Sequence, residues 1–138
     1  MTINYTSTVT DIIAERQLAV EGEPGKSVVL SIGKPRPDPR GDWVCPVQVQ
    51  GVSESQQLNG YGVDAVQALM NALEAARYIF DQSDLTLTWP GGEPGDVGIP
   101  RLIPASFGLA FARNIEAYVD REVENFAKAA QKGSGGED

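Results

Sequence analysis

Apolar and polar residues alternate along the first half of the chain with the period of two that is typical of half-buried strands. The segments with this pattern are residues 12–20, 27–32, 43–50 and, more weakly, 56–61. Turn-forming residues separate the first two segments at Glu21-Gly22-Glu23-Pro24-Gly25. Pro46 has no backbone N–H, which predicts an edge position or a bulge in the third segment. The first half therefore predicts four strands.

Residues 33–42 join the second and third of these strands and contain three alternating prolines. Each proline fixes its own φ and pushes the preceding residue toward extended geometry. Asp38-Pro39-Arg40-Gly41 fits a type I turn, with Pro at the second position and Gly at the fourth. We therefore expect a stiff loop despite its length.

Helical spacing of apolar residues begins at Asp64, a good N-cap, and Gln67 completes a pair like a capping box. The predicted apolar stripe is Val66, Leu69, Met70, Leu73 and Phe80. An adjoining stripe of small residues is Ala65, Ala68, Ala72 and Ala75. Such a helix can lie close against a sheet, and we expect it to end near Gln82.

A second helix is predicted from Ser106, its N-cap, to Lys132. One face gathers Phe111, Ile115, Tyr118, Val119, Val123 and Phe126. The aromatic residues Phe107, Phe111, Tyr118 and Phe126 exceed what one sheet can cover, which favours a homodimer or partner interface. An ordinary core helix explains the pattern equally well.

Between the helices, residues 85–89 alternate like a strand and residues 90–100 are rich in Gly and Pro. That loop lacks the glycine spacing of a phosphate-binding turn, so we expect a mobile surface loop or a lid. The order β-β-β-β-α-β-α predicts an α+β fold, a mostly antiparallel sheet of about five strands with two helices packed on one face. We expect a single domain over 1–132 and a flexible acidic tail over 133–138.

Composition removes several kinds of chemistry. The chain has no histidine and one cysteine, Cys45, which rules out catalytic triads that need an imidazole and leaves no disulfide. No motif for a metal, cofactor or catalytic residue is found, and Cys45 lies among apolar residues that suggest a core position. The net charge of −8 disfavours nucleic acid as a partner. No membrane-spanning run or signal peptide is visible, so we expect a cytoplasmic protein.

The proline-rich loop is the one candidate ligand site. Guanidinium groups on a stiff loop can clamp a carboxylate or phosphate, and an aromatic ring adds a stacking surface. The residues of this hypothesis are Arg36, Asp38, Arg40, Asp42, Trp43 and Tyr61. The alternative, which we favour, is that Arg36 and Arg40 pair with Asp38, Asp42 or the acidic helices, since most charges pair or are solvated at the surface.

Three stretches carry a resemblance to a known family: Ile32 to Pro46, Tyr61 to Leu69, and Leu87-Thr88-Trp89 followed by Gly98-Ile99-Pro100-Arg101. Together they resemble a family of short bacterial proteins that is classed as a domain of unknown function. The resemblance covers about residues 12–104, and the second helix is less typical of it. It implies no established activity, cofactor or catalytic residue.

The sequence therefore favours a non-enzymatic protein-binding module, either an immunity-type protein or a dimeric accessory factor. Its acidic surplus suits a basic partner. The rival hypothesis is a small-ligand or anion-binding protein, or a small enzyme, that uses the loop of Arg36, Arg40 and Asp42.

Overall fold

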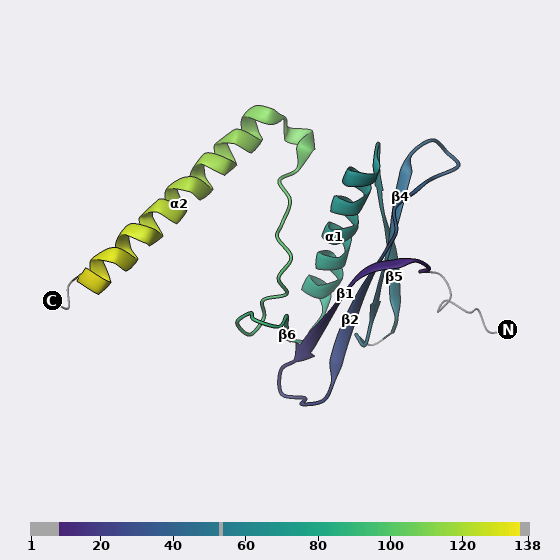
Figure 1. Cartoon of the computed structure of the whole chain (residues 1–138), viewed down its shortest axis with the longest axis horizontal. Coiled ribbons are helices and arrows are strands. Elements are labelled where there is room, and N and C mark those ends of the chain that lie inside the picture. The colour runs from purple at the N-terminus through teal and green to yellow at the C-terminus, as the bar shows by residue number, and fades with distance from the viewer. Residues whose placement is uncertain (1–8, 53, 136–138) are drawn as a thin grey trace. The chain divides into compact units, whose positions relative to one another are not determined.

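The computed structural model describes residues 9–52 and 54–135, and contacts within the chain group it into two compact units, Met1–Arg101 and Leu102–Asp138. The first unit combines a sheet with one helix, α1 (Figure 1). Its elements are β1 (Ile12–Val20), β2 (Ser27–Gly33), β3 (Arg36–Pro37), β4 (Trp43–Gln50), β5 (Gln56–Gly62), α1 (Ala65–Gln82) and β6 (Leu87–Thr88). The second unit contains a short 3-10 helix, η2 (Ala105–Phe107), and α2 (Leu109–Gly135).

Within the described residues the sheet has six strands, and all of their pairings are antiparallel. The path runs β3-β4-β2-β1-β6, and β5 pairs along the other edge of β4. The α+β class and the mostly antiparallel sheet are thus confirmed. One strand was missed, because β3 is two residues of the proline-rich loop that pair with Trp43 and Val44. The predicted turn in that loop is confirmed by the hydrogen bond from Gly41 N to Asp38 O (2.9 Å).

Pro46 lies in β4, a strand with neighbours on both sides, and not at an edge of the sheet. The described ladder between β2 and β4 stops at Ile32 and Val47, one residue before Pro46, which has no N–H to donate. The Cys45 thiol instead donates a hydrogen bond to the Gly33 carbonyl (3.3 Å). A Cβ on Gly33 would lie 2.7 Å from Pro46 Cγ, so only glycine fits beside the ring. The break in the ladder explains how a central strand accommodates a proline.

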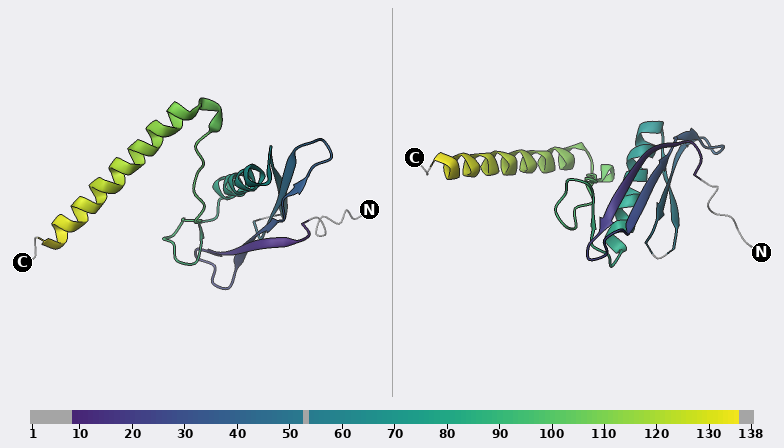
Figure 2. Two further views of the ribbon diagram at one scale, coloured as in Figure 1. Left: turned by 45° about the horizontal axis from the view of Figure 1, so that its top comes forward. Right: turned by 60° about the horizontal axis from the view of Figure 1, so that its bottom comes forward.

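Helix α1 lies across one face of the sheet, as Figures 1 and 2 show, and it begins and ends as predicted. Asp64 Oδ1 accepts from Gln67 N (2.8 Å), while Gln67 Oε1 accepts from Val63 N (2.7 Å). These reciprocal bonds satisfy backbone donors at the start of the helix and confirm the predicted cap.

The inward face of α1 differs from the predicted apolar stripe. Fully buried Ala68, Ala72 and Ala76 face the sheet, whereas Val66 and Met70 are exposed. The reason is the closeness of the layers: a Cβ on Gly60 would lie 2.7 Å from Ala72 Cα, and one on Gly62 would lie 2.5 Å from Ala68 N. The adjoining stripe of small residues therefore forms the closest contact, and Val66 and Met70 turn away from it. The rest of the predicted stripe faces the core: Phe80 is buried, and Leu69 and Leu73 are half-buried against it.

Hydrogen bonds hold the glycine-rich segment that follows β6. The sequence had predicted a mobile loop or a lid there. Trp89 N donates to Asp96 O (2.9 Å), and Gly98 N donates to Asp96 Oδ1 (2.8 Å). From β1, Arg16 Nη1 donates to Gly98 O (2.8 Å). The next residues continue into the core, where Ile99 is buried.

The second unit begins differently from its prediction. Ser106 lies inside η2 and is not an N-cap, and α2 starts three residues later at Leu109. Gly108 separates the two helices with a φ of 94°, which favours glycine. Packing of the second helix on the sheet stays a prediction.

Candidate functional site

The six residues of the predicted loop site lie on the paired strands β3, β4 and β5 and on the loop that joins β3 to β4. Arg36 forms an ion pair with Asp11, and Arg40 Nε lies 3.7 Å from Asp38 Oδ2. The Arg40 side chain is 87% exposed, so this second pair contributes little to stability. Both loop arginines therefore have acidic partners: Asp38, which the favoured alternative names, for Arg40, and Asp11, which it does not name, for Arg36.

Trp43 and Tyr61 lie on neighbouring strands, but their side chains point in different directions. Trp43 is opposite Gly62 in the ladder and packs against the core. Tyr61 is opposite Val44, one position along, and is 48% exposed. Since successive side chains of a strand point to opposite faces, the two rings do not form one stacking surface. Ligand binding at the loop stays a prediction.

Cys45 occupies the core, as its neighbours in the sequence indicate. Its side chain is fully buried, and burial raises the pKa of its thiol above the ordinary value. A thiol nucleophile needs the opposite shift, toward a lower pKa, to react at neutral pH. The environment of Cys45 therefore suits a structural residue.

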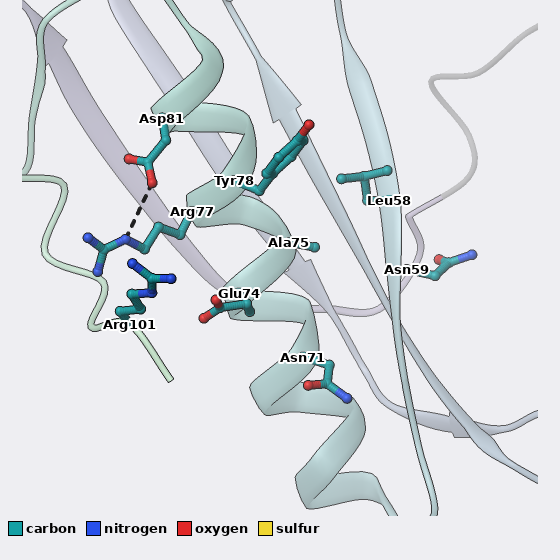
Figure 3. A pocket seen from close by; sticks show the side chains of 9 residues that line it. All are labelled: Leu58, Asn59, Asn71, Glu74, Ala75, Arg77, Tyr78, Asp81 and Arg101. Carbon is teal, nitrogen blue, oxygen red and sulfur yellow. Dashed lines mark ion pairs between the residues drawn. The ribbon is translucent and has the colours of Figure 1, made fainter. Parts of the chain in front are cut away.

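The largest of the three cavities described in the first unit, about 580 Å³, is a shallow concavity over the exposed side of α1 (Figure 3). Strand β5 borders it on one side and Arg101 on the other. Its lining residues are Leu58, Asn59, Asn71, Glu74, Ala75, Arg77, Tyr78, Asp81 and Arg101. None of the six residues of the predicted loop site lines this concavity or the other two described cavities, of about 330 and 190 Å³.

Two guanidinium groups distinguish the concavity. Arg77 Nη1 donates to Ile99 O (2.8 Å), and its Nε lies 3.6 Å from Asp81 Oδ2. Arg101 has no hydrogen-bond or ion-pair partner among the described residues. Sequence reasoning missed this arrangement, although the spacing of four between Arg77 and Asp81 on a helix was a visible signal for their ion pair.

A family model described as a domain of unknown function, DUF6968, matches residues 14–101, which is more than half of the chain. The chain belongs to this family. No curated protein and no solved structure matches it. The match ends at Arg101, where the first compact unit also ends, so the DUF6968 region contains the whole sheet after its first residues, helix α1 and the concavity.

Helices η2 and α2 lie outside the DUF6968 match and carry the residues of the predicted interface, Phe107 in η2 and the other three in α2. Phe107 is 65% exposed, Phe111 40%, Tyr118 54% and Phe126 78%. The rings of Phe107 and Phe111 pack together with centroids 5.1 Å apart. The other apolar residues of the predicted stripe are also exposed, namely Ile115, Val119 and Val123, as is Leu109 at the start of α2. The predicted aromatic surplus is thus present at the surface of this unit.

Within residues 9–52 and 54–135, no group of three or more Cys, Asp or Glu side chains is arranged to hold a metal ion. In the same part of the chain, no helix combines the length and the apolar character that crossing a membrane requires.

Proposed function

We propose that this DUF6968 protein is a non-enzymatic protein-binding module and that the apolar stripe of α2 is its binding surface. The single observation that supports this most is the exposure of that stripe, where large apolar side chains are between 37% and 78% exposed. Contiguous apolar surface of this kind marks sites of association.

The physical reason is the cost of a lone amphipathic helix. Most of the stability of helices in proteins comes from packing an apolar face and not from intrinsic propensity. In α2 the stripe recurs at Phe111, Ile115, Val119, Val123 and Phe126, spacings of three and four residues that keep it on one side of the helix. Covering this stripe with a partner stabilises both the helix and the complex.

A second copy of the chain is the partner that the charges favour. Residues 109–135 hold four basic and four acidic side chains, so two α2 helices do not repel one another through net charge. Residues 1–101, by contrast, hold seven basic and thirteen acidic side chains. Net charge therefore opposes pairing through the first unit more than pairing through α2.

The test is the mass of the purified chain in solution by light scattering, across a range of concentrations. We expect a dimer that Val119→Glu shifts to monomer, because a charge replaces an apolar side chain in the middle of the stripe. The matched control is Ala117→Glu, which adds the same charge on the opposite side of α2 and should leave the mass unchanged.

Two outcomes redirect or remove the proposal. A monomeric wild-type chain that binds a different protein, with Val119→Glu abolishing the complex, assigns the stripe to a foreign partner; the acidic first unit would suit a basic one, as in an immunity-type protein. A monomeric chain that binds no protein, or a dimer that Val119→Glu leaves intact, contradicts the use of α2.

A further inference from the structure

We propose that the concavity over α1 is a binding site for a carboxylate group, which Arg77 and Arg101 hold. This site lies in the DUF6968 region and shares no residue with α2, so it is independent of the proposed association. The ligand class that fits is an N-acylated amino acid or the C-terminus of a peptide.

Arg77 is held in place before any ligand arrives. Its Nη1 is fixed by Ile99 O (2.8 Å) and its Nε faces Asp81 Oδ2 (3.6 Å), while the side chain is 32% exposed. These contacts restrict the guanidinium and leave Nη2 without a contact among those described. A donor whose geometry is already fixed loses less conformational entropy on binding than a free side chain does.

Arg101 supplies the second positive group. It lines the same concavity, and Figure 3 shows its guanidinium on the same flank of α1 as that of Arg77. Two like charges that share a concavity repel one another. An anion bound between them attracts both, and these two attractions outweigh the repulsion. Guanidinium groups match a planar carboxylate with two parallel N–H···O bonds, which makes this group a good bridge.

The remaining lining residues indicate which groups the ligand carries beside its carboxylate. Asn71 Nδ2 donates to Tyr61 O (2.6 Å), which restricts its amide group. The Oδ1 atom of Asn71 can accept a hydrogen bond, as from the amide N–H of an N-acylated amino acid. Tyr78 and Leu58, 63% and 38% exposed, offer apolar surface for a side chain.

Charge balance favours a carboxylate over a phosphate. The two arginines share the lining with two acids, Glu74 and Asp81, so the formal charge of the lining is zero. A phosphate group carries up to about two negative charges at neutral pH and is repelled more by these acids than a singly charged carboxylate is.

The experiment is an NMR titration of the full chain, labelled with ¹⁵N, with N-acetylphenylalanine as the probe. We expect saturable shifts of the amide signals of residues 71–81 and of the side-chain Nε–H of Arg77. N-acetylphenylalaninamide, which lacks the carboxylate, should bind at least about tenfold more weakly, the effect of losing one charge-assisted hydrogen bond. Inorganic phosphate should also bind more weakly, because Glu74 and Asp81 repel its larger negative charge. A capped glutamate with both ends blocked distinguishes a side-chain carboxylate from a C-terminal one, and tighter binding of either acid supports the site.

Variants assign the binding to the two arginines. Arg101→Gln should weaken binding of N-acetylphenylalanine by about tenfold or more. The substitution removes none of the described hydrogen bonds or ion pairs, so the fold should be unaffected. Arg113→Gln, the same change on α2, is the matched control and should leave the affinity unchanged. Equal binding of acid and amide, no shift with any probe, or equal affinity in Arg101→Gln would overturn the proposal.

Discussion

The guanidinium carbon of Arg16 lies 5.0 Å from the centre of the Trp89 ring, although the two residues are far apart in the sequence. Arg16 belongs to the first strand and Trp89 follows the last one. The same guanidinium donates to the carbonyls of Val97 (3.2 Å) and Gly98 (2.8 Å). A Cβ on Gly98 would lie 2.7 Å from Trp89 Cγ and 2.8 Å from Arg16 Nη1, so glycine is required there. Arg16 thus joins the glycine-rich segment to the sheet.

Replacing Arg16 by methionine should therefore destabilise the first unit. Arg16→Met keeps an unbranched apolar stem but removes the hydrogen bonds to two carbonyls and the contact with the ring. Hydrogen bonds to a charged group are worth about 1.5–3 kcal/mol, and we expect a loss of that order in the free energy of unfolding by urea. Arg40→Met, at a side chain that is 87% exposed, should change it by less than about 0.5 kcal/mol. Equal effects of the two substitutions would refute this role of Arg16.

Adding a methyl group at Gly60 should separate the helix from the sheet. In Gly60→Ala the new Cβ would lie within 2.7 Å of Ala72 Cα, and backbone atoms on both sides cannot move independently. Overpacking of this kind costs about 1–3 kcal/mol or more. Urea unfolding followed by circular dichroism measures the loss, with Gln56→Ala at an exposed position of the same strand as control. A Gly60→Ala protein as stable as the control would show that the layers are less close than described.

The cap of α1 should be worth about 1 kcal/mol, the usual contribution of an N-cap side chain. Asp64→Ala removes the acceptor of the Gln67 N–H, whereas Asp64→Asn keeps an oxygen at the same place. The thermal unfolding temperature should therefore decrease in the order wild type, Asp64→Asn, Asp64→Ala. The difference between wild type and Asp64→Asn should be small. If Asp64→Asn is as destabilised as Asp64→Ala, charge at the helix N-terminus matters and the hydrogen bond does not.

The burial of Cys45 predicts that the free energy of unfolding depends on pH in the alkaline range. Burial raises the pKa of its thiol in the folded state above the ordinary value of 9.0, so the folded state holds the proton more tightly than the unfolded state does. The resulting stability is complete below pH 9.0 and is lost as the pH rises through the folded pKa. We expect the stability advantage of wild type over Cys45→Ala to be constant at neutral pH and to fall above that point.

Two measurements check this prediction. Urea unfolding of both proteins at several pH values isolates the thiol, because all other ionising groups are common to them. A thiol-specific reagent should label native Cys45 slowly and the unfolded chain rapidly. Rapid labelling of the native protein at neutral pH would mean that the thiol is accessible and ionised, contrary to its burial.

Several elements followed from the sequence because their causes are local. Alternation predicted the long strands, and Asp64 with Gln67 predicted the start of α1 to the residue. The absence of histidine is a property of composition alone and removes imidazole chemistry without any structure. The exposed aromatic residues of α2 were also recognisable, because their number and spacing are written in one segment.

Tertiary structure decided what depends on residues far apart in the chain. The inward face of α1 was set by Gly60 and Gly62, whose small size admits alanines and leaves Val66 and Met70 outside. Pro46 was accommodated in a central strand because the β2 ladder ends beside it. The concavity of Arg77 and Arg101 combines a helix with the segment after the last strand. Local periodicity carries no information about such pairs, since close packing between layers and not spacing along the chain determines them.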